Sequence, residues 1–110
     1  MNPDIVKFVE ACTRWGHYDN YGISKQCNKE FKNIRKMYET LKQENRLDEL
    51  LELLGHENPY VRLYAATYTL PIATQRAEQT LENLTGIIKS NVGFVARMTL
   101  QEWRNGHMKL

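Results

Sequence analysis

Apolar residues recur along this chain with the spacing of amphipathic helices. A first helix is expected to begin at Asn2-Pro3-Asp4, where a capping side chain, a proline and an acid suit a helix N-terminus. Its inward face is predicted at Ile5, Phe8, Cys12 and Trp15. Gly16 and the polar, aromatic run 17–22 are expected to end it in a loop. A longer helix should begin near Ser24, with an apolar stripe formed by Cys27, Phe31, Ile34, Tyr38 and Leu41.

Four shorter helices are predicted in the rest of the chain. A leucine-rich helix begins at Leu47 and stops at Gly55. Asn58-Pro59 repeats the capping pattern of the N-terminus and opens a helix over 59–70. Further helices are expected over about 74–84 and 93–104. No stretch alternates with period two for long enough to predict a sheet, so the expected class is all-α with about six helices.

The second half of the chain carries an internal repeat. A shift of 34 residues superposes Leu47 on Leu81, Leu50 on Leu84, Leu53 on Ile87, Leu54 on Ile88, Pro59 on Gly93, Tyr60 on Phe94 and Val61 on Val95. A register kept across two helices and their turn predicts duplicated helical hairpins over 47–106, stacked to share one core. Residues 1–46 would be an irregular capping helix pair, and 1–110 one domain.

The run 53–66 resembles a HEAT-type repeat. A leucine-rich helix there precedes a second helix that opens with Pro59, Val61 and Arg62 and carries the paired alanines Ala65-Ala66. The W-x2-L-G-x2-Y start of tetratricopeptide repeats is absent. Arg62 would sit at the inter-helix turn, where HEAT-like families often place an arginine. The resemblance implies an α-solenoid of stacked hairpins.

A narrower resemblance covers about residues 47–106. The run 58–72, together with 93–104, is similar to a family of small uncharacterised bacterial proteins. Some small helical-repeat proteins of this kind are immunity proteins, which neutralise toxins delivered between competing bacteria. This resemblance implies a bacterial, non-catalytic protein whose partner is a cognate toxin.

Composition and charge are those of an ordinary globular domain. Hydrophobic residues make up 42% and charged residues 25%, and the net charge of +2 is too small to imply nucleic-acid binding by itself. Basic residues concentrate in 25–36 and acidic ones in 39–57. No apolar run is long enough to span a membrane, and the start lacks signal-peptide features. Cys12 and Cys27 are expected to be buried, reduced thiols, and the expected location is cytoplasmic.

No constellation of residues indicates catalysis or metal binding. The three histidines, His17, His56 and His107, have no partner at metal-ligand spacing. Ser24 and Ser90 lie at helix boundaries, where capping explains them. Phosphate-binding and nucleophile motifs are absent as well. We therefore expect a protein that is not an enzyme and has no cofactor and no metal.

The expected activity is binding of a protein, and the candidate contact residues are Glu49, Glu52, Glu57, Tyr60, Tyr64, Thr67 and Tyr68. The three tyrosines recur every four residues, which fits either a core stripe or aromatic contacts on a concave face. The flanking carboxylates suit the basic active-site groove of a nuclease-type toxin, which the protein would block. The free protein is expected to be monomeric.

The alternative is a helical-repeat protein that binds nucleic acid. Lys25, Lys29, Lys32 and Lys36 would form one row on the second helix, and such a row can follow phosphates. The row is short, and no exposed aromatic residue interleaves with it for base stacking. A solvated helix face explains it more simply, so nucleic acid stays the second hypothesis.

Overall fold

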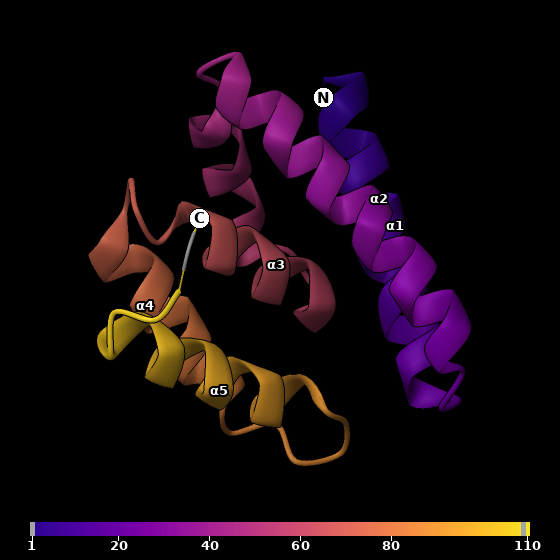
Figure 1. Ribbon diagram of the computed structural model, residues 1–110. Coiled ribbons are helices and arrows are strands. Elements are labelled where there is room, and N and C mark those ends of the chain that lie inside the picture. The colour runs from indigo at the N-terminus through magenta and orange to yellow at the C-terminus, as the bar shows by residue number, and fades with distance from the viewer. Residues whose placement is uncertain (1, 109) are drawn as a thin grey trace.

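Six helices make up the computed structural model, which describes residues 2–108 and 110 (Figure 1). They are α1 (Pro3–Asn20), α2 (Ser24–Gln43), the 3-10 helix η1 (Leu47–Gly55), α3 (Pro59–Thr69), α4 (Thr74–Leu84) and α5 (Val92–Arg104). These residues form no strand, so the all-α prediction is confirmed for them. None of the six helices combines the length and the apolar character that a membrane crossing needs.

The two predicted asparagine–proline helix starts are confirmed. At α1 the Asn2 side chain accepts a hydrogen bond from the Asp4 backbone N–H at 2.9 Å. At α3 the Asn58 side chain accepts one from the Tyr60 N–H, also at 2.9 Å. In each case a proline follows the cap, because its missing N–H leaves no donor unpaired at the first helical position.

The prediction that Gly16 ends the first helix is wrong, because α1 continues to Asn20. Gly16 is buried, and a Cβ atom built on it would lie only 2.3 Å from Cδ2 of Tyr60 in α3. Its missing side chain therefore lets α1 and α3 approach closely, and does not terminate the helix. The chain turns later, at Gly22, whose φ of 68° is in the left-handed region that favours glycine.

The turn between η1 and α3 is held by Arg62, as the HEAT-type resemblance implied. Its guanidinium donates to the backbone carbonyls of His56 and Glu57, the latter at 3.1 Å. His56 adds to the same turn, since its Nδ1 accepts a hydrogen bond from the Asn58 N–H at 3.0 Å. These bonds pair backbone groups that the helix ends leave free.

Helix α3 is the centre of the core. Most of its residues are buried, because it packs against α1 and η1 on one side and against α4 and α5 on the other (Figure 1). From α2, the core takes Ile34, Tyr38 and Leu41. The predicted α2 stripe is correct for these residues but not for Phe31, which is 42% exposed at its edge.

One charged residue, Glu30, is buried between α1 and α2. Its carboxylate pairs with Nε of Arg14 at 3.0 Å and accepts a hydrogen bond from the Asn33 side chain at 3.2 Å. In the sequence, Glu30 lies within the basic stretch 25–36. Its position on the inner face of α2 makes it a link between the first two helices.

The 34-residue register holds for α3 and α5 but not for the helices that precede them, η1 and α4. Helix α3 begins at Pro59 and α5 at Val92, one residue before the position that the shift predicts. Helix α4, however, ends at Leu84, so Ile87 lies in the loop before α5, whereas its counterpart Leu53 lies within η1. The chain thus forms three helix pairs, α1–α2, η1–α3 and α4–α5, in a body of 34 × 29 × 25 Å.

Candidate partner-binding surface

The acidic residues predicted to meet a partner have different environments. Glu52 and Glu57 are exposed. Glu49 is engaged within the molecule, since its two oxygens accept hydrogen bonds from Nε and Nη2 of Arg46 at 2.7 and 3.2 Å. This bidentate pair holds the pKa of the Glu49 carboxyl below its usual range. The predicted acidic surface is therefore reduced to Glu52 and Glu57.

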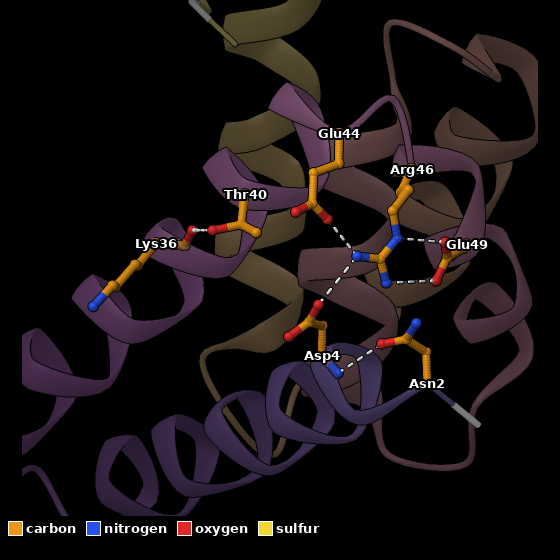
Figure 2. Close-up of polar contacts among 7 residues, drawn as sticks. All are labelled: Asn2, Asp4, Lys36, Thr40, Glu44, Arg46 and Glu49. Carbon is orange, nitrogen blue, oxygen red and sulfur yellow. Dashed lines mark hydrogen bonds and ion pairs between the residues drawn. The ribbon is translucent and has the colours of Figure 1, made fainter.

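Arg46 joins three parts of the fold, as Figure 2 shows. Besides Glu49 of η1, its guanidinium contacts Asp4 of α1 at 3.1 Å and Glu44 at the end of α2. The three carboxylates raise the pKa of the arginine, so it keeps its charge. This cluster fixes the open end of the α1–α2 pair, where α1 begins and α2 ends, against η1.

The three tyrosines are part of the core, so the structure corrects the prediction that they contact a partner. Tyr60, Tyr64 and Tyr68 are 5%, 7% and 2% exposed. The α1–α2 pair covers them: the Trp15 ring lies 5.5 Å from Tyr60 and 5.3 Å from Tyr64, and Phe8 lies 6.4 Å from Tyr68. A central helix packs against neighbours on several sides, which the four-residue spacing alone could not reveal.

Burial also affects the phenols of this stripe. Removal from water raises the pKa of Tyr68 to about 12 and that of Tyr64 further. The Tyr60 hydroxyl donates to the Asn20 side chain at 2.8 Å, which ties the end of α1 to the start of α3. Nearby, Thr67 is half-buried and its hydroxyl donates to the Leu63 carbonyl at 2.7 Å, a bond within its own helix.

The lysine row is exposed on α2, as predicted. Lys25, Lys29, Lys32 and Lys36 lie on the side of the helix opposite Ile34 and Leu41. Phe31, an exposed aromatic residue of the same helix, directly precedes Lys32, but adjacent residues of a helix point in different directions, so it lies outside the row. The Phe31 ring instead lies 6.2 Å from Tyr64, so no aromatic surface accompanies the lysines along α2.

An exposed apolar surface that the sequence did not indicate lies on α5. Phe94 is 61% exposed and Met98 is 41% exposed, on the side of α5 opposite the buried Ala96 and Leu100. Ile88, in the loop before α5, is 90% exposed. Glu102 continues the same row one turn further on and is also exposed. We call Phe94, Met98 and Glu102 the α5 stripe.

The 34-residue shift relates the α5 stripe to the tyrosines of α3. It superposes Phe94, Met98 and Glu102 on the three tyrosines of α3. The tyrosines are covered by the α1–α2 pair, whereas the α5 stripe faces solvent in the described part of the chain. The internal register marks these α5 positions as equivalents of packing residues, but only the fold shows that they are exposed.

One further surface groove lies between α1 and α2. This groove is lined mostly by charged and polar side chains, which include Lys7, Glu10 and Arg14. Asp4, Lys36 and Thr40, which also line it, are labelled in Figure 2. Within residues 2–108 and 110, no three His, Cys, Asp or Glu side chains are grouped closely enough to hold a metal ion. His56 is used in the η1–α3 turn.

These features define a small all-helical protein of three helix pairs, with the apolar residues Phe94 and Met98 exposed on its last helix. The family described as a domain of unknown function (DUF2019) matches residues 4–103, and the chain belongs to that family. Comparisons with curated proteins and with solved structures gave no match.

Proposed function

We propose that this protein is a non-catalytic protein-binding module whose docking site is the α5 stripe. The observation that carries the proposal is that Phe94 and Met98 are exposed at positions whose α3 counterparts are packing residues. Single exposed apolar residues are common on protein surfaces. A row in the register of a packing stripe is different, because its spacing suits contact with another helix.

Burial of the α5 stripe is energetically useful to a complex. A Phe or Met side chain contributes about 1.5–3 kcal/mol when it is moved fully from water into an apolar contact. Phe94 and Met98 are already partly covered, so each has a fraction of that gain available. A rim of charged and polar residues around them, including Arg97 and Gln101, matches the usual anatomy of an interface.

In this proposal the three helix pairs form a HEAT-like stack, and the partner is a toxin that the protein neutralises by blocking its active site. The resemblance of residues 47–106 to small bacterial helical-repeat proteins supports this partner class. The exposed Glu52 and Glu57 support it as well, because carboxylates speed encounters with a basic nucleic-acid-binding groove. Glu49 has no part in it, since Arg46 holds its carboxylate.

The test is co-expression with the product of the adjacent upstream gene, followed by measurement of complex formation and of growth. A stoichiometric complex and rescue of growth are expected for the wild type. Phe94→Ser/Met98→Ser should lose both. Ile72→Ser is the matched control, because Ile72 is 49% exposed and lies outside the α5 stripe, and it should behave as the wild type.

Two results would overturn the proposal. One is a complex that the Phe94→Ser/Met98→Ser variant forms as tightly as the wild type. The other is retention of DNA or RNA that falls steeply with salt and depends on Lys25 and Lys29, which would establish the nucleic-acid hypothesis instead.

A further inference from the structure

We infer that the partner docks on α5 as an amphipathic helix pair, in the way that α1 and α2 dock on α3, and that it places a basic side chain opposite Glu102. This inference rests on the proposed function and specifies the chemistry of the partner. Its basis is that the three tyrosines of α3 have the same spacing and are already covered by α1 and α2; we call them the occupied stripe. The side chains that cover the occupied stripe indicate what the α5 stripe would accept.

The occupied stripe is covered by aromatic side chains from two helices. Trp15 of α1 lies against both Tyr60 and Tyr64, with ring centres at 5.5 and 5.3 Å. Tyr38 of α2 stacks on Tyr68 at 4.2 Å with an interplanar angle of 17°. A helix pair, rather than one helix, thus covers the three tyrosines along their length.

A cation lies at the Tyr68 end of this interface. The guanidinium carbon of Arg35 is 5.2 Å from the centre of the Tyr38 ring, which is the ring stacked on Tyr68. Burial raises the pKa of Tyr68, and the positive charge of Arg35 acts in the opposite direction. The covering pair α1–α2 therefore places a positive charge at this position of the stripe.

On α5 the position equivalent to Tyr68 is Glu102, an exposed carboxylate. A helix pair that docks on α5 in the same register would bring its Arg35-equivalent residue next to that carboxylate. Oppositely charged groups at this position favour the complex, and a carboxylate there opposes it. The α5 stripe thus specifies a partner with apolar side chains over Phe94 and Met98 and a basic residue one turn beyond.

A second copy of this chain is a poorer occupant. Its own α1–α2 pair presents its apolar side to α3, where Phe8 and Tyr38 are already buried. The opposite side of α2 carries the lysine row, which offers no apolar stripe. In the described part of the chain, the α1–α2 pair thus shows how a partner could dock on α5, but this pair is itself packed against α3.

The experiment titrates fluorescein-labelled helical hairpin peptides into the full-length chain and follows their anisotropy. Two designed peptides share one apolar stripe and differ only at the position facing Glu102, which is arginine in the first and glutamate in the second. The wild-type chain should bind the arginine peptide about tenfold more tightly than the glutamate peptide. Glu102→Lys should reverse that preference. Phe94→Ser/Met98→Ser should bind neither peptide, and Ile72→Ser should bind as the wild type.

The outcomes separate the two proposals. If Phe94→Ser/Met98→Ser loses the cellular complex but Glu102→Lys does not change the peptide preference, the docking site stands and the predicted partner chemistry is wrong. Failure of the chain to bind either peptide would also overturn the inference. Sedimentation that shows a dimer of the free chain, dissolved by Phe94→Ser, would identify a second copy as the occupant and overturn it as well.

Discussion

Replacement of Gly16 by alanine tests how closely α1 and α3 are packed. Helix propensity alone predicts that Gly16→Ala stabilises the protein by about 1 kcal/mol, because the residue lies inside α1. The tertiary contact predicts the opposite. The new Cβ would lie 2.3, 2.5 and 2.8 Å from the Cδ2, Cγ and Cε2 atoms of Tyr60, all far shorter than a van der Waals contact.

The Tyr60 ring has little freedom to move away from the new methyl group. Its hydroxyl is bonded to Asn20 at 2.8 Å, and the Trp15 ring lies 5.5 Å from its centre. Overpacking of a well-filled core costs about 1–3 kcal/mol, and three short contacts to a held ring belong to the upper part of that range. After subtraction of the propensity gain, Gly16→Ala should lower the free energy of unfolding by about 1–2 kcal/mol.

The measurement is urea unfolding followed by far-ultraviolet circular dichroism. The wild type, Gly16→Ala, Tyr60→Ala and the double variant form a double-mutant cycle. Once Tyr60 is alanine the ring is gone, so Gly16→Ala should then stabilise by about 1 kcal/mol. The sign reversal is the decisive result. If Gly16→Ala stabilises the protein in both backgrounds, the close approach of α1 to α3 is wrong.

Three further predictions concern other packing and charge contacts. Gly93→Ala should destabilise the protein more than Gly16→Ala, because its Cβ would lie 2.2 Å from the Ile87 backbone carbonyl oxygen, which is less free to shift than a side chain. The control is Gly55→Ala, whose Cβ meets nothing within 4 Å. Equal melting temperatures for the two variants would contradict the prediction. Arg46→Met should abolish an acid-linked loss of stability. Because the pKa of Glu49 is lowered in the fold, the Arg46–Glu49 pair stabilises the protein fully above the usual carboxyl pKa, and this contribution disappears as pH falls through the lowered value. Thermal melts from neutral to acid pH should show this loss for the wild type only. Burial raises the pKa of Tyr68 to about 12, so the neutral phenol stabilises the fold below its ordinary pKa, and that contribution is lost as pH rises through the higher value; alkaline melts should show less of this loss in Tyr68→Phe.

Local patterns in the sequence were sufficient to predict where most of the helices lie. Asn2 and Asn58 cap their helices through their own side chains, and the spacing of apolar residues placed α2, α3, α4 and α5 within one residue at most ends. Such signals act between residues three or four apart, so they can be recognised without knowledge of the rest of the fold. The all-α class follows from the same kind of information. The turn position of Arg62, by contrast, was implied by the HEAT-type resemblance.

Tertiary contacts decided which stripe is buried and which is free. In the sequence, Gly16 predicts the end of a helix because glycine is flexible. In the fold, its missing side chain leaves space for the Tyr60 ring, and this contact joins residues far apart in the chain. The tyrosines of α3 and the residues of the α5 stripe share one spacing, and only the position of the α1–α2 pair makes the first set core and leaves the second exposed. Amphipathic spacing specifies that a helix has an apolar side. What covers that side depends on the neighbours that stacking provides, and on α5 that neighbour is the proposed partner.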